Sequence, residues 1–319
     1  MKKFISFNLI FVLLLLCGCS DNKENKETRM MLDTAVTLTA SCSEDAFAEA
    51  FAICENYENL FSKTRKGSDV YRLNEATDFI EVSAETAEII GDSFVYSKIS
   101  GDKFDITVEP VVSLWDFENS KMPSRDEISS ALENVDYNKI QIKDTNHIFL
   151  NGARVDLGAM AKGYIADKLL EHFKLKNASK GIIDLGRNIV VFGDRDYDVG
   201  IVDPFATDKT AAIVTVRNKS VVTSGTYERS FKKNGELYHH IIDPETGYPA
   251  ETDLASATII GDSCVQADAL STICILAGKE KAKEIVQSFP GVNAVFIDTE
   301  GNISYTDGLA EIDGKIVIK

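Results

Sequence analysis

The chain contains a single long apolar run, and it stands at the very beginning. Residues 4–16 are apolar except for Ser6 and Asn8, and Lys2 and Lys3 precede them. The run is shorter than the roughly 20 residues that span a bilayer, and it has the basic flank of a secretory signal peptide. A polytopic membrane protein is therefore excluded, and the rest of the chain must fold as a globular body.

The end of this run carries a second signal. Gly18 directly precedes Cys19, behind a leucine-rich stretch, which resembles a bacterial lipobox. An ordinary signal peptide with incidental cysteines is the alternative. We expect a lipoprotein signal peptide over 1–18, a lipidated Cys19, and a flexible tether over 19–29, where polar residues dominate. The body would then lie outside the cytoplasm, anchored by lipid to a bacterial membrane.

The amino-acid composition limits the classes of molecule that the protein can bind. Among 319 residues, 34 are basic and 50 acidic, so the net charge is −16, while 44% are hydrophobic. That hydrophobic share is ordinary for a globular protein and excludes overall disorder. The acidic balance argues against a nucleic-acid partner, because phosphate backbones require a basic surface. A small anionic ligand stays possible, since a local site can oppose the global field.

Besides Cys17 and Cys19, the chain contains four cysteines. They are Cys42, Cys54, Cys264 and Cys274. An oxidising compartment permits two disulfides, but the pattern favours small buried side chains. The spacing has no CxxC and no nearby histidine, so it does not indicate a zinc site.

Helical and strand-like segments alternate without a regular βαβ rhythm over 30–319, which we treat as one domain. The pattern predicts an α+β fold with antiparallel or mixed sheets and packed helices. We expect helices at 43–61, 84–99, 126–132, 160–173 and 264–289, the last with a break near Gly278. We expect strands at 35–40, 181–192, 197–202, 211–216, 256–260, 294–297 and 316–318.

One segment joins a strand end to a helix start at 156–167. Free backbone N–H groups at such a start suit an anion, Gly158 allows close approach, and Lys162 could neutralise charge. A plain strand–helix connection is the alternative.

A second segment places a carboxylate and a hydroxyl on one helical face. Asp268 and Thr272 are four residues apart among apolar neighbours. A buried carboxylate is costly unless it is paired, and carboxylate, hydroxyl and carbonyl oxygens suit Mg²⁺. An Asp that caps the helix is the alternative.

Three further segments carry polar or aromatic groups. A strand over 221–225 ends in hydroxyls and a glycine, and the turn at 243–247 follows His239 and His240. Only one of these histidines can face inward from an alternating strand, as a general base or as a structural residue. Trp115 lies near carboxylates and hydroxyls, where it could hold a planar ring or fill a core.

Taken in order, these segments resemble the ApbE family of FAD:protein FMN transferases, over roughly residues 30 to 300. The matching stretches are 33–34, 61–64, 68–74, 104–115, 156–167, 184–189, 223–225, 240–247 and 267–272. An ordered set of this kind is more specific than any one motif.

The resemblance implies an ApbE-like, T-fold-related architecture and a reaction. FAD is bound with Mg²⁺ near its pyrophosphate, a threonine hydroxyl of an acceptor flavoprotein attacks the FMN phosphorus, and AMP leaves. The acceptor would be an FMN-binding domain or a redox-pump subunit. The implied metal ligands are the Ala159 carbonyl, Asp268 and Thr272, and His240 is the implied base. The implied FAD contacts are Leu32, the region from Thr64 to Lys66, Lys103, Phe104, Asp105, Asp156 and Lys162.

The sequence departs from the family pattern at a few positions. Arg187 stands where a second glycine is common, Asp184 where Asn is common, and Leu32 where Met is frequent. Two other activities use the same residues, namely hydrolysis of FAD to FMN and AMP, and non-catalytic binding of FAD by a lipoprotein.

Overall fold

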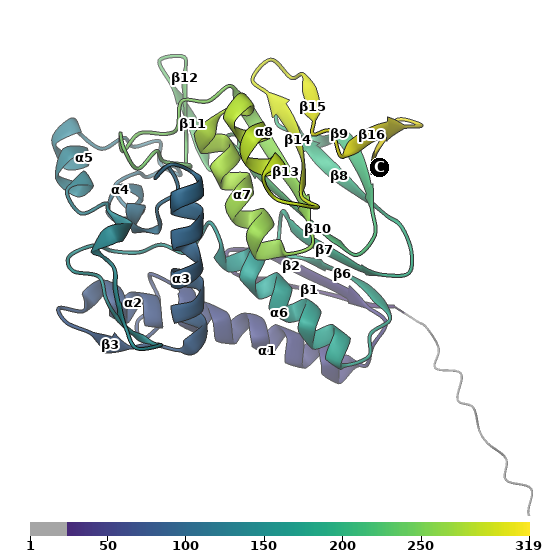
Figure 1. Ribbon diagram of the computed structural model, residues 1–319, viewed down its shortest axis with the longest axis horizontal. Coiled ribbons are helices and arrows are strands. Elements are labelled where there is room, and N and C mark those ends of the chain that lie inside the picture. The colour runs from purple at the N-terminus through teal and green to yellow at the C-terminus, as the bar shows by residue number, and fades with distance from the viewer. Residues whose placement is uncertain (1–23) are drawn as a thin grey trace, which may run out of the picture.

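A computed structural model describes residues 24–319. The signal peptide and the lipidated Cys19 expected from the sequence lie outside these residues. One large sheet forms the centre, with helices on one face, a smaller sheet on the other, and a helical lobe beside them (Figure 1).

The central sheet has eight strands, and every neighbouring pair is antiparallel. Its strands follow the order of the chain, with long insertions between β2 and β6 and between β10 and β13. From edge to edge the strands are β1 (Asn25–Met31), β2 (Thr34–Ala40), β6 (Lys180–Asp184), β7 (Asn188–Gly193), β10 (Lys219–Gly225), β13 (Leu254–Gly261), β14 (Asn293–Asp298) and β15 (Ile303–Tyr305).

Four helices cover one face of this sheet (Figure 1). They are α1 (Glu44–Phe61), α6 (Ala161–Leu175), α7 (Cys264–Ala277) and α8 (Lys279–Gln287). Helix α7 is buried on most of its surface, which explains why its sequence is apolar nearly all round. The polar side chains that it retains are therefore candidates for a function.

A four-stranded sheet packs on the other face. Its order is β16 (Leu309–Ile312), β17 (Lys315–Ile318), β9 (Ala206–Val216) and β8 (Tyr197–Asp203), with β17 and β9 parallel. A second apolar cluster fills the space between the sheets, with Val221 and Val295 from one and Val199 and Val214 from the other.

The helical lobe, residues 69–149, carries α2 (Asp69–Glu75), α3 (Ala84–Ile99), α4 (Glu109–Val112) and α5 (Arg125–Leu132), with β3 (Ile80–Glu81), β4 (Gln141–Lys143) and β5 (His147–Phe149). The hairpin of β11 (Ser230–Lys233) and β12 (Glu236–His239) lies beside it. A third cluster joins lobe and hairpin, in which Trp115 stacks on Tyr238 and donates from Nε1 to the Gly247 carbonyl. Trp115 is thus a core residue.

The structure confirms the α+β class and the five expected helices, including the break at Gly278, whose φ is +74°. One predicted strand was wrong in extent. Residues 181–192 form a hairpin of β6 and β7, because Gly186 and Arg187 both adopt positive φ and turn the chain. The four cysteines of residues 24–319 are free thiols.

The expected tether needs a correction at its end. Residues 25–29 belong to β1, which pairs with β2 along its whole length. The strand is polar because it lies at the sheet edge, where backbone hydrogen bonds hold it without an apolar face. Between residues 24 and 319 no helix combines the length and apolarity that crossing a bilayer requires.

Candidate functional site

The site is built where the first turns of α6 and α7 touch. Gly163 lies so close to α7 that a β-carbon there would stand 2.5 Å from the Cys264 carbonyl oxygen. Its N–H donates to Asp268 Oδ2 at 2.8 Å. From the next turn, Asp167 accepts from the Cys264 N–H at 2.8 Å and caps α7. The first turn of α6 is thereby fixed against the first turn of α7.

Asp268 is a buried carboxylate, and its contacts only partly offset the free-energy cost of removing it from water. It is 6% exposed, and burial raises its pKa to about 6, although Lys162, Asn188 and the Gly163 N–H lower it. Asn188 is also buried, and its Nδ2 has no partner in hydrogen-bond geometry among residues 24–319. Because desolvation of a lone carboxylate is unfavourable, this position suits a cation.

Hydroxyl groups extend the site from α7 to the end of β10. Ser224 Oγ lies 2.7 Å from Ser271 Oγ and 3.3 Å from Thr272 Oγ1. Residues 24–319 contain no group of three or more His, Cys, Asp or Glu side chains that could hold a metal. A donor set of one carboxylate with hydroxyl and carbonyl oxygens is what Mg²⁺ accepts, since it keeps several waters. Asp268 and Thr272 of α7 are donors of these kinds, and the expected third ligand, Ala159, lies in the turn just before α6.

His240 follows β12 and its Nδ1 lies 3.1 Å from the Glu228 carbonyl oxygen. Burial, with smaller effects of His239, Arg229 and Lys162, lowers its pKa to about 4. The ring is therefore neutral at pH 7. Because a carbonyl oxygen only accepts, Nδ1 carries the proton and Nε2 keeps a lone pair. His240 has the protonation state of a general base.

His239 plays a different part. It is 4% exposed, its Nε2 donates to the Ala250 carbonyl at 3.2 Å, and its Nδ1 accepts from the Ile241 N–H. Both ring nitrogens are used by the backbone, so His239 is a structural residue.

Lys162 interacts electrostatically with several titratable groups of the site. It lowers the pKa of Asp268 and of Glu228, and it contributes to the low pKa of His240. Coulombic interactions with all three place Lys162 among α7, the loop after β10 and the residue after β12. The structure thus brings together Lys162 of α6, Asp268 and Thr272 of α7, and His240, which come from three distant segments.

The expected FAD contacts Thr64, Lys103 and Asp156 lie around ion pairs. Lys63 Nζ is 2.8 Å from Asp156 Oδ2, and Thr64 is exposed next to it. Lys103 Nζ is 2.9 Å from Asp243 Oδ2, in the turn that follows His240. These two lysines are positioned at the junction of the helical lobe with the rest of the body.

Three other expected contacts have structural duties. Phe104 is buried against Tyr96, and its N–H donates to Ser100 Oγ at 2.8 Å. Asp105 accepts from the Thr107 and Tyr137 N–H groups, and burial raises its pKa. Leu32 is half-buried at φ +54°, in the turn between β1 and β2.

Sequence reasoning missed Glu228 and gave Arg187 no partner. Arg187 Nε lies 2.7 Å from Glu228 Oε1, and its Nη1 lies 2.7 Å from the Tyr227 hydroxyl. No periodicity reveals such a pair, because the two residues belong to separate turns. The unusual arginine after Gly186 is the only sequence signal that pointed to this place.

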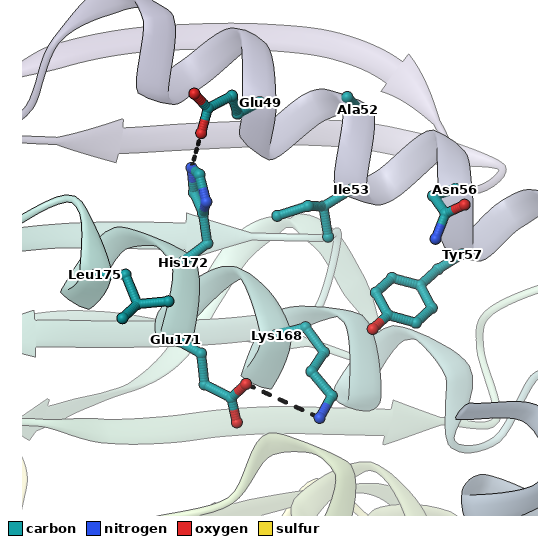
Figure 2. A pocket seen from close by; sticks show the side chains of 9 residues that line it. All are labelled: Glu49, Ala52, Ile53, Asn56, Tyr57, Lys168, Glu171, His172 and Leu175. Atoms are coloured by element: carbon teal, nitrogen blue, oxygen red, sulfur yellow. Dashed lines mark ion pairs between the residues drawn. The ribbon is translucent and has the colours of Figure 1, made fainter. Parts of the chain in front are cut away.

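An open groove of about 540 Å³ lies elsewhere, between α1 and α6 (Figure 2). It shares no residue with the site. Its polar groups approach one another along or between the two helices, as Lys168 does with Glu171 at 3.9 Å and His172 Nε2 with Glu49 at 3.9 Å. The lining residues are Glu49, Ala52, Ile53, Asn56, Tyr57, Lys168, Glu171, His172 and Leu175.

Comparison with known proteins gives a consistent result. The family profile described as the ApbE family matches residues 32–296. A curated FAD:protein FMN transferase of Treponema pallidum is 32% identical over 303 residues, covering 86% of this chain and 84% of the relative. The crystal structure of an ApbE protein from Thermotoga maritima matches with a TM-score of 0.81 and 29% identity, over 89% of this chain and 97% of the other.

A second solved structure, the apo form of the flavinyl transferase ApbE of Pseudomonas stutzeri, matches with a TM-score of 0.79 and 25% identity, over 89% of this chain and 95% of that chain. The matched regions contain both helix starts, the hydroxyl-rich end of β10 and His240. The chain belongs to the ApbE family.

Proposed function

We propose that the protein is an FAD:protein FMN transferase. In this reaction, the FMN moiety passes from FAD to a threonine hydroxyl of an acceptor flavoprotein, AMP is released, and Mg²⁺ is required. The curated relatives carry the name of this activity. The observation that carries the proposal is the meeting of a buried, undercompensated Asp268 with a neutral His240 around Lys162.

The chain's own residues divide the work as follows. Asp268, Thr272 and the Ala159 carbonyl would hold Mg²⁺, which supplies charge to offset that on the phosphate oxygens. Lys162 adds a second positive charge at the start of α6. The junction residues Lys63, Lys103 and Asp156 would bind and orient FAD.

His240 Nε2 would accept the proton of the acceptor threonine. The hydroxyl oxygen forms a bond to the phosphorus of the FMN moiety, the bond from that phosphorus to the oxygen of the AMP phosphate breaks, and AMP leaves with the electron pair. The neutral state of His240 and the lone pair on Nε2 support this role.

One experiment separates transfer from its two alternatives. The purified body, residues 24–319, is incubated with FAD, Mg²⁺ and a candidate acceptor domain that carries a single target threonine. Flavin bound covalently to the acceptor supports transfer. Free FMN with AMP, in equal amounts with and without the acceptor, would mean hydrolysis. Intact FAD that stays bound would mean a non-catalytic binding protein.

We further propose that Cys19 is lipidated and that the body is held on the outer side of a bacterial membrane. The sequence around Cys19 supports this. The full chain is expressed in a bacterium, and its distribution is compared with that of Cys19→Ser. The native protein is expected in the membrane fraction with its body accessible to added protease. Equal partitioning of the two would contradict the proposal.

A further inference from the structure

We infer that Arg187 is a positioning residue for His240, acting through Glu228. Its guanidinium holds Glu228 in the place where the Glu228 carbonyl accepts the Nδ1 proton of the imidazole. The inference deepens the proposed function, on which the role of His240 as a base rests. Arg187 itself touches neither of the reacting groups in this scheme.

The first step is how firmly Arg187 is held. It sits at φ +80° in the turn after β6, and its carbonyl accepts from the Thr223 N–H of β10 at 3.2 Å. Its side chain binds Glu228 Oε1 and the Tyr227 hydroxyl, each at 2.7 Å, and lies 5.0 Å from the Tyr227 ring centroid. Arg187 thus adopts a backbone angle that favours glycine, and its long side chain makes three contacts that hold it there.

The second step is how Glu228 meets His240. Ser230 pairs with His239 at the open end of the β11–β12 hairpin, so the residues just outside the pair face one another. There the Glu228 carbonyl oxygen lies 3.1 Å from His240 Nδ1. One residue therefore binds Arg187 with its side chain and His240 with its backbone.

The third step is electrostatic. Glu228 Oε1 is shielded from solvent, and burial raises the pKa of the carboxyl, while Arg187 is the largest charge that lowers it. Lys162 and Arg229 add smaller contributions. Without the guanidinium, a shielded carboxylate has lost its main counter-charge, so the side chain must turn to water or take up a proton. Either change removes the side-chain anchor of Glu228, so the backbone carbonyl of the same residue is no longer held against His240.

The chemical consequence is a choice between tautomers. With the Glu228 carbonyl in place, Nδ1 is protonated and Nε2 can accept a proton. When the carbonyl moves away, the ring is free to protonate on Nε2, and that form cannot act as a base from the same atom. Arg187 would thus set the fraction of molecules with a competent base.

The test compares Arg187→Gln with Arg217→Gln. Arg217 also pairs with carboxylates, from Nε to Asp196 and from Nη1 to Asp194, in the turns beside β8 and β9, which belong to the smaller sheet and not to the hairpin that precedes His240. The protein has four histidines, so the imidazole ¹⁵N shifts of the free protein can be assigned. We expect Nδ1–H at His240 in the native protein and in Arg217→Gln, and a mixture of tautomers in Arg187→Gln.

The kinetic readout follows from the same argument. Arg187→Gln is expected to lower kcat for transfer by about tenfold with the KM for FAD unchanged, since only the share of active base falls. Arg187→Lys restores the charge and is expected to recover part of that loss. If Arg187→Gln does not fold, Glu228→Gln keeps the carbonyl, removes the ion pair, and must shift the same tautomer.

An unchanged His240 tautomer in a folded Arg187→Gln, or an equal loss in Arg217→Gln, would overturn the inference. The proposed function fails separately. If His240→Asn transfers FMN at the native rate, the base lies elsewhere, whatever the ¹⁵N shifts of the native protein show about Arg187.

Discussion

The place where α6 meets α7 and the groove between α1 and α6 differ in how their charges are held. At the helix starts, Asp268 is buried and interacts with groups from β7 and α6. In the groove, Glu171 and Glu49 are more than half exposed, at 65% and 51% of their side chains. Helix α6 takes part in both, so one element carries a constrained end and a solvated end.

This difference distinguishes a surface groove from a site whose side chains are suited to catalysis. Exposed ion pairs contribute little free energy, because water screens them and their side chains lose entropy. A buried carboxylate is kept only where something offsets its desolvation. The groove is a depression lined by solvated ion pairs, whereas the starts of α6 and α7 hold a buried carboxylate whose pKa is raised to about 6.

The largest effect is expected from Asp268→Ala, which should reduce transfer on the order of a hundredfold or more, since charge stabilisation by a metal is worth several kcal/mol. Covalent flavin on the acceptor is measured over a Mg²⁺ titration. The matched control is Glu171→Ala in the groove, which should behave as the native protein. A native rate in Asp268→Ala would remove the metal site.

His240→Asn should slow transfer by about a hundredfold, because a positioned base contributes a factor of this order. FAD binding, followed by flavin fluorescence, should survive, since His240 is assigned to the acceptor proton. Loss of FAD binding in this variant would instead make His240 part of the dinucleotide pocket.

Gly163→Ala tests the packing that creates the site. Its β-carbon would meet the backbone of Cys264 and Val265, so α6 and α7 must separate, at a cost of about 1–3 kcal/mol in the free energy of unfolding. Gly91→Ala is the matched control, since a β-carbon at that helical position meets nothing within 4 Å and should stabilise by up to about 1 kcal/mol. Urea denaturation measures both. Equal changes would show that the close approach of the helices is unimportant.

The low pKa of His240 predicts a pH dependence of stability. Its folded value of about 4 lies below the ordinary 6.5, so the unfolded chain binds the proton more readily between these values. The contribution is complete above pH 6.5 and is lost as the pH falls towards 4, by up to about 3 kcal/mol. Native protein should therefore lose more stability on acidification than His240→Asn. Parallel curves would contradict the burial of a neutral imidazole.

The smallest effect is expected in the groove. Lys168→Ala should change the free energy of unfolding by less than about 0.5 kcal/mol, because its ion pair with Glu171 is long, at 3.9 Å, and solvated. Transfer should be unaffected. A clear loss of transfer would mean that the groove serves the reaction and that its charges were misjudged.

Local signals explain most of what the sequence could predict. The helices at α1, α3 and α7 follow from apolar spacing, and the break at Gly278 from a residue that tolerates positive φ. The strand β1 was missed, because a polar edge strand is held by backbone bonds to β2 and leaves no pattern in its side chains. Polar composition there indicated a tether where the sheet provides a partner.

The site was predictable only in part, for a related reason. Asp268 and Thr272 share a helical face, which spacing alone reveals. The contact between Arg187 and Glu228 joins two turns 41 positions apart, and neither turn has a periodicity. Phe104 matches a motif position, yet its side chain is buried in the core, and the motif alone does not reveal that burial.

The pairing of β2 with β6 has a consequence for how the molecule assembles. Ser41 and Lys180 are 139 residues apart, and all of α1, the helical lobe and α6 lie between them. During synthesis, the whole lobe is therefore made after β1 and β2 and before β6, the strand that pairs with β2. Contacts between residues so far apart in the sequence form slowly. Until β6 has been made, the edge of β2 that faces away from β1 has no strand to pair with.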